Sequence, residues 1–347
     1  MNVKEARRVA FEWVSQFSSR HLTFHSAYLA GSITELKELD ELTQSSDVDV
    51  FIVVNSNDVP LKPGKIRASG VCLDITYLPW SVVRKTDNVQ RSYHLANSLK
   101  KNTILLDPTG ELQQVQSIVE SQFYQRKWVE ARCEDARSRI TNNLDTLPAH
   151  STWAEQVTGW LFAAGVMTHV LLVADVRNPT VRLRYLRVKE MLHHYGLDHI
   201  YIDLLNFLGC QHLTPTIITS HLEQLEETFD VAASVAKTPL FFSTDLTQEA
   251  KAISIQGSRD LIAAGHHHEA IFWMVATYAR CHQIFTLDAP HLLSMKGFNK
   301  LLLDLGIRSP TDLNQRANKV REYLPELKKQ AQYIMSINSR IEEGVIE

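Results

Sequence analysis

Three acidic residues in the first quarter of the chain have the type and spacing to bind a metal ion. Asp47 and Asp49 alternate with valines in the strand-like run "DVDVFIVVN", and Asp74 lies in the later strand-like run "GVCLDITYLPW". Residues two apart in a strand project from the same face, about 7 Å apart. If the two strands are neighbours, the three carboxylates converge and repel one another. A divalent cation such as Mg²⁺, which prefers oxygen ligands, would relieve that repulsion.

A Gly-Ser turn supplies a second feature, suited to binding phosphate. Gly31 and Ser32 follow the strand-like "SAYLA" and precede "ITELKELDEL", which we expect to form a helix. Glycine lets the backbone approach a ligand closely, and a helix N-terminus offers free N–H groups to an anion. The Ser32 hydroxyl adds a donor. Fourteen residues separate Ser32 from Asp47.

The order of these features resembles the nucleotidyltransferase superfamily, which includes DNA polymerase beta and the small-molecule (antibiotic, aminoglycoside-type) nucleotidyltransferases. The matching residues are Ala30, Gly31, Ser32, Asp47, Val48, Asp49, Val50 and Asp74. The resemblance implies that Asp47 and Asp49 bind Mg²⁺ in a two-metal site, with Asp74 as third ligand or general base. It also implies that Gly31 and Ser32 hold the phosphates of ATP or another nucleoside triphosphate.

The arrangement of strand and helix signals predicts an α+β protein with two domains. Strand-like runs are confined to roughly the first 110 residues, where they alternate with helical ones, and helical patterns fill the rest. We expect a catalytic domain over 1–120, with a mixed β-sheet flanked by helices. An all-α helical bundle over 121–347 would bind the substrate, with a candidate subdivision near 236–245.

Two features of the helical half are candidate parts of the site. A basic helix, predicted to begin at Pro179 after Asn178, carries Arg182 and Lys189 on one flank, where they could neutralise nucleotide phosphate. The alternative is a solvated helix with basic flanks. Glu155 lies in the first turns of the helix expected after Ser151. The resemblance to antibiotic nucleotidyltransferases implies that it deprotonates the acceptor, whereas a first-turn glutamate also simply favours the helix dipole.

Composition limits the cellular setting and the partners. The net charge of -3 argues against a broad nucleic-acid surface. Four widely spaced cysteines without a CxxC pair predict reduced thiols. The charged, amphipathic N-terminus is unlike a signal peptide, and we expect no membrane span, because no run of about 18 apolar residues occurs. We therefore expect a cytoplasmic monomer or homodimer.

These observations predict a Mg²⁺-dependent nucleotidyltransferase. It would transfer a nucleoside monophosphate, AMP from ATP in the first instance, to a hydroxyl of a small molecule and release pyrophosphate. An aminoglycoside-type antibiotic is one acceptor that the resemblance implies. Two alternatives remain open: transfer to protein or RNA termini, and a non-catalytic nucleotide-binding regulatory protein.

Overall fold

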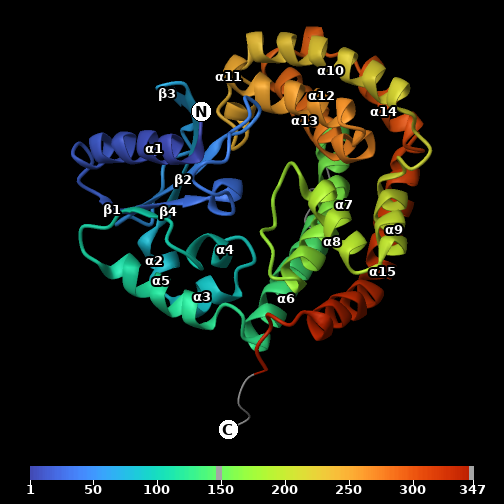
Figure 1. The fold of residues 1–347 in the computed structure, drawn as a ribbon. Coiled ribbons are helices and arrows are strands. Elements are labelled where there is room, and N and C mark those ends of the chain that lie inside the picture. Colours follow the sequence, from blue (N-terminus) through green and yellow to red (C-terminus); the bar gives the residue numbers. More distant parts are fainter. Residues whose placement is uncertain (146–150, 344–347) are drawn as a thin grey trace. The chain divides into compact units, whose positions relative to one another are not determined.

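The computed structural model describes residues 1–145 and 151–343, which form two compact units (Figure 1). The sheet unit contains Met1–Arg132, Val176–Asn178 and the segment from Asn338 onward. The helical unit contains Cys133–Asp175 and Pro179–Ile337. Residues 146–150 and 344–347, which belong to the predicted second domain, lie outside the described residues. A mixed sheet together with many helices confirms the predicted α+β class.

A five-stranded mixed sheet forms the centre of the sheet unit. Its strands are β1 (Phe24–Ala30), β2 (Val48–Val54), β3 (Gly64–Ala68), β4 (Val71–Pro79) and β5 (Ile104–Leu106). Their order is β3-β4-β2-β1-β5, with β2 and β4 parallel and every other pair antiparallel. Strands β1, β2 and β4 coincide with the strand-like runs identified in the sequence, whereas β3 was not predicted.

Helix α1 (Val3–Ser18) covers one face of this sheet and thereby sets which way the β2 side chains point. The apolar stripe of α1 packs in one core cluster with Val48, Val50 and Ile52 of β2. Burying each such side chain contributes roughly 1.5–3 kcal/mol. A slip of one residue would turn this set outward and Asp49 into the core. The hydrophobic alternation therefore places Asp49 on the face opposite α1.

Four helices complete the sheet unit on the side away from α1 in Figure 1: α2 (Trp80–Val83), α3 (Thr86–Arg91), α4 (Ala96–Leu99) and α5 (Glu111–Gln122). Helix α2 contacts β2 and β4, and α4 contacts β1. These elements lie on the same side as the face that carries Asp49.

The unpredicted strand β3 is the charged edge of the sheet. It joins β4 through a two-residue turn, in which Ser69 and Gly70 have φ values of 44° and 85°. Positive φ at both turn residues is typical of a type I′ hairpin. Charged side chains at Lys65 and Arg67 suit an edge strand, which must avoid pairing with other chains, but they remove the apolar signal that predicts a strand.

The prediction of a helix after Ser32 is wrong. Residues Gly31–Thr34 form a single 3₁₀ turn, and the chain then continues without regular helix to β2. Backbone carbonyls of Glu38 and Asp40 instead accept hydrogen bonds from the Lys4 and Val3 amides, each at 3.0 Å. These amides begin α1 and have no partner within it. The segment therefore caps a neighbouring helix, and the Gly-Ser turn has no helix N-terminus behind it.

The helical unit is built around α7 (Trp153–Ala174). The other helices of eight residues or more are α8 (Arg184–His194), α9 (Asp198–Leu208), α10 (Pro215–Val235), α13 (His267–Asp288), α14 (Lys296–Asp304) and α15 (Pro310–Ile337), together with the C-terminal half of α6 (Arg126–Asp145). Helix α7 is long and apolar enough to cross a membrane, but 83% of its most apolar window is buried. It packs against α8, α13 and α15 as a core helix.

The chain leaves α7 through a segment that is not helical. The helix predicted to start at Pro179 begins only at Arg184, so Arg182 precedes it. Val176 is buried and has φ 52°, a left-handed conformation that is costly for a β-branched residue. His169 Nε2 lies 2.8 Å from the Thr180 carbonyl, which holds residue 180 away from a helical path.

Candidate functional site

Register across three strands brings the charged residues together. Asp49 of β2 is the partner of Asp74 in β4, and Asp74 is the partner of Lys65 in β3. On the other side of β2, Asp49 is the partner of Ala30, the last residue of β1. Partners on adjacent strands project from the same face, so these side chains form one row across the sheet. Asp47 lies just before β2.

Two lysines, which sequence reasoning missed, neutralise much of this acidic charge. Lys65 Nζ lies 2.8 Å from Asp74 Oδ2 and 3.1 Å from Asp47 Oδ2, and the Lys65 side chain is only 5% exposed. Lys62 Nζ lies 2.7 Å from Asp74 Oδ1. A buried carboxylate is costly unless it is paired, and these contacts provide the pairing.

Asp49 is the carboxyl group with the most perturbed titration. Its pKa is raised from the ordinary 3.8 to about 8, chiefly by burial and then by the charges of Asp47 and Asp74, while Lys65 and Lys62 oppose the shift. At neutral pH its carboxyl group therefore carries a proton. The charges of the other two carboxylates and of the two ammonium groups then sum to zero. The residues of the cluster therefore neutralise one another's charge.

Gly31 lies directly against Asp49. It has φ +65°, and a Cβ added there would be 1.8 Å from Asp49 Oδ2. Its carbonyl accepts hydrogen bonds from Thr34 Oγ1 at 2.8 Å and from Asn178 Nδ2 at 2.9 Å. Asn178, predicted only to precede a helix, thus fixes the peptide beside the carboxylates. Ser32 is exposed, and its hydroxyl has no partner among the described residues.

The donor set suits a hard cation, although its present arrangement does not form a cage for one. The carboxylates of Asp47, Asp49 and Asp74 provide the oxygen ligands that Mg²⁺ prefers. Within the described ranges, no group of three or more metal-binding side chains is placed to hold a metal ion. Lysine contacts pair two of the carboxylates, and Gly31, which has no Cβ, lies directly against the third, Asp49.

The three residues predicted from the helical half all lie in the helical unit. Glu155 forms a capping box: its Oε2 accepts from the Thr152 amide at 2.7 Å, while the Glu155 amide donates to Thr152 Oγ1. Lys189 Nζ lies 2.6 Å from Glu269 Oε1. Arg182 lies in a turn before α8. Helix capping and core ion pairing therefore explain Glu155 and Lys189 without a nucleotide.

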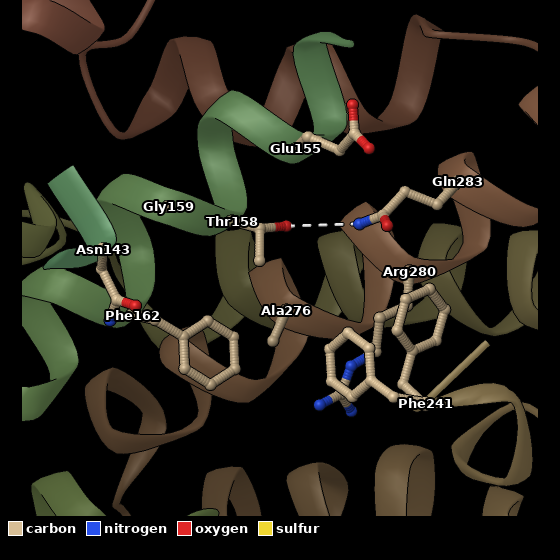
Figure 2. Close-up of a pocket in the computed structure, with 10 residues that line it drawn as sticks. Asn143, Glu155, Thr158, Gly159, Phe162, Phe241, Ala276, Arg280 and Gln283 are labelled. Carbon is tan, nitrogen blue, oxygen red and sulfur yellow. Dashed lines mark hydrogen bonds between the residues drawn. The ribbon is translucent and has the colours of Figure 1, made fainter. Parts of the chain in front are cut away.

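Glu155 also lines a cavity of about 280 Å³ within the helical unit (Figure 2). Glu155 belongs to α7, and residues of α13 form another wall of the cavity. All the residues that line this cavity belong to the helical unit.

Comparison of the sequence with protein-family models gives no match, and comparison with curated proteins gives no significant relative.

The missed residues had only weak signals in the sequence. Lys62 and Lys65 lie in "LKPGKIRA", where a charged edge strand is hard to distinguish from a loop. Asn178, which donates a hydrogen bond to the Gly31 carbonyl, lies 147 positions from Gly31 in the sequence, and no local pattern predicts such a contact.

Proposed function

We propose that the chain is a nucleotidyltransferase that uses the carboxylate row of the sheet unit. The observation that carries the proposal is the register of Asp49 with Asp74, next to a glycine whose missing Cβ leaves its backbone against Asp49. A purely structural role accounts poorly for this cluster, because a buried carboxyl group that must stay protonated lowers the stability of the fold.

Asp47, Asp49 and Asp74 would hold Mg²⁺, which would supply charge neutralisation for a triphosphate. Binding of the cation requires Asp49 to give up its proton. The Gly31 backbone and the Ser32 hydroxyl would contact phosphate oxygens. Lys62, whose side chain is 28% exposed, would exchange its contact with Asp74 for a phosphate.

In the proposed reaction, a hydroxyl of the acceptor attacks the α-phosphorus of ATP or another nucleoside triphosphate. A new P–O bond forms, the bond from the α-phosphorus to the bridging oxygen breaks, and pyrophosphate leaves. The hydroxyl proton passes to a carboxylate of the row, with Asp74 as our candidate base. The acceptor that we propose is a small molecule, and an aminoglycoside-type antibiotic is our first candidate. We propose a cytoplasmic location for the enzyme.

The lysine contacts favour a second candidate, a nucleotide-binding regulatory protein without turnover. Lys65 is nearly buried between Asp47 and Asp74, and a cluster balanced in this way needs no metal ion. Such a protein would bind the triphosphate without Mg²⁺ and release no pyrophosphate.

Calorimetric titration of ATP, with and without Mg²⁺, separates the two candidates. The transferase requires Mg²⁺-dependent binding that Asp49→Asn and Asp74→Asn abolish, and pyrophosphate release when candidate acceptors are added. Asp58→Asn, at an exposed position of the same unit, is the matched control and should behave as wild type. If none of ATP, GTP, CTP and UTP binds the wild-type chain, both candidates are wrong.

A further inference from the structure

The helical unit contains a cavity that none of the proposed chemistry uses. Two helices form its walls (Figure 2). Glu155, Thr158, Gly159 and Phe162 follow one face of α7, and Ala276, Arg280 and Gln283 follow one face of α13. Gly159 and Ala276 are small, so they leave space between the helices. The volume of about 280 Å³ is just below the range of about 300–1,000 Å³ for drug-sized ligands, and it suits a smaller molecule.

Aromatic rings dominate the apolar part of the wall. Phe162 projects from α7, and Phe241 and Phe242 come from the loop that precedes α11 (Gln248–Lys251). Phe241 is 73% exposed, so its ring lies where the cavity meets the surface. An aromatic ring at the edge of a cavity is available to stack on a flat ligand.

The polar groups of the wall give the cavity a net negative charge. Arg280 is already neutralised: its Nη1 lies 3.0 Å from Asp245 Oδ2, and its guanidinium stacks over Trp273 at 4.8 Å. Glu155 has no such cation, because its Oε2 accepts only from Thr152 and no described group bonds to Oε1. One uncompensated carboxylate therefore remains.

A carboxylate and phenyl rings that line the same cavity select for an organic cation. The carboxylate attracts the positive charge, and the faces of aromatic rings attract it as well. Asn143 also lines the cavity, and its side-chain amide makes no hydrogen bond to the described residues, so it can orient a ligand. We propose that the helical unit binds a small monocation with a flat apolar group, with the positive charge at Glu155 and the flat group against Phe162 and Phe241.

Three probes of nearly identical shape test this proposal by charge. Benzamidine is a cation, benzamide is neutral and benzoate is an anion. We expect benzamidine to bind the full chain with a Kd near 1 mM, as suits a probe of about nine heavy atoms. Benzamide should bind about tenfold more weakly, and benzoate more weakly still. Calorimetry and ligand-detected NMR at low salt measure the series.

Two variants locate the probe without unfolding the chain. Glu155→Gln should remove the preference for benzamidine over benzamide and leave the melting temperature unchanged, because glutamine also serves in a capping box. Phe241→Ala, at an exposed position, should weaken both ligands equally. Glu190→Gln removes a carboxylate of α8, outside the cavity, and is the control that should change nothing.

Three results would overturn the proposal: benzoate binding as tightly as benzamidine, an unchanged preference in Glu155→Gln, or no binding by any of the three probes. The assay contains no nucleotide and involves no residue of the carboxylate row. Its failure would therefore leave the proposed transferase untouched, and failure of the transferase would leave this binding site untouched.

Discussion

Replacing Asp49 by asparagine should make the nucleotide-free protein more stable at neutral pH. The folded chain holds this carboxyl group at a pKa of about 8, because burial and the neighbouring carboxylates disfavour its charge. The unfolded chain ionises it near 3.8. Between these two values the folded state binds one more proton than the unfolded state, so the free energy of unfolding falls as pH rises. Asparagine cannot ionise and does not carry this penalty.

The size of the effect follows from proton linkage. Each pH unit between the two pKa values costs about 1.36 kcal/mol. From about pH 5 to about pH 7.5, the stability of Asp49→Asn relative to wild type should therefore rise by up to about 3.4 kcal/mol. For a folding unit of about 150 residues, in which 1 kcal/mol shifts the melting temperature by about 2–4 °C, that is a relative shift of roughly 7–14 °C. A constant offset from the substitution itself cancels in the comparison of the two pH values.

Denaturant or thermal unfolding of both proteins at the two pH values measures this difference. Asp58→Asn, at an exposed position, supplies the control and should show no pH-dependent gain. If the gap between Asp49→Asn and wild type is the same at both pH values, or shrinks as pH rises, then Asp49 is not held protonated and our account of the cluster is wrong. Mg²⁺ with ATP should stabilise wild type by about 2.7 kcal/mol at a hundred times its Kd, and should not stabilise the variant.

Three further substitutions test the contacts of the Gly31 peptide and the role of Lys189. Gly31→Ala should lose nucleotide binding and cost clearly more stability than Gly110→Ala, since both have positive φ but only the first Cβ meets Asp49; equal melting temperatures would contradict the close approach. Asn178→Ala should lower nucleotide affinity severalfold in calorimetry while costing about 0.5–1.5 kcal/mol of stability, and unchanged affinity would show that the Gly31 peptide needs no support. Lys189→Met should destabilise the chain by about 1–3 kcal/mol in thermal unfolding with ATP binding intact, because it breaks an ion pair to a buried carboxylate, and lost binding would restore its predicted nucleotide role.

The sequence predicted the sheet well, because alternation within a strand is a local signal. Apolar and polar residues alternate over 47–50 and 73–77, and burial of the apolar set fixes which face Asp49 and Asp74 occupy. Their adjacency required only that the two strands be neighbours. The class of fold and the juxtaposition of these two carboxylates were therefore within reach of sequence reasoning.

The rest was hidden because it depends on contacts between distant segments. The run after Ser32 has a helical pattern, but its carbonyls accept hydrogen bonds from the first amides of α1. Helix propensity depends on the local sequence and does not reflect such a contact. Pro179 is a good first residue for a helix, yet the chain at Asn178 is drawn to the Gly31 carbonyl instead. In both places a tertiary hydrogen bond prevails over a local preference.

The lysines change how the carboxylate cluster should be understood. From the sequence alone, the adjacent carboxylates indicate a metal ion, because no other positive charge that could neutralise them is identified. In the structure Lys65 and Lys62 provide two positive charges, and the proton on Asp49 removes the third negative charge. The proposed Mg²⁺ must therefore compete with a proton and with ammonium groups already in place. A triphosphate, which brings negative charge for those ammonium groups to pair with, makes that exchange favourable. We thus expect cation and nucleotide to bind together, each weakly on its own.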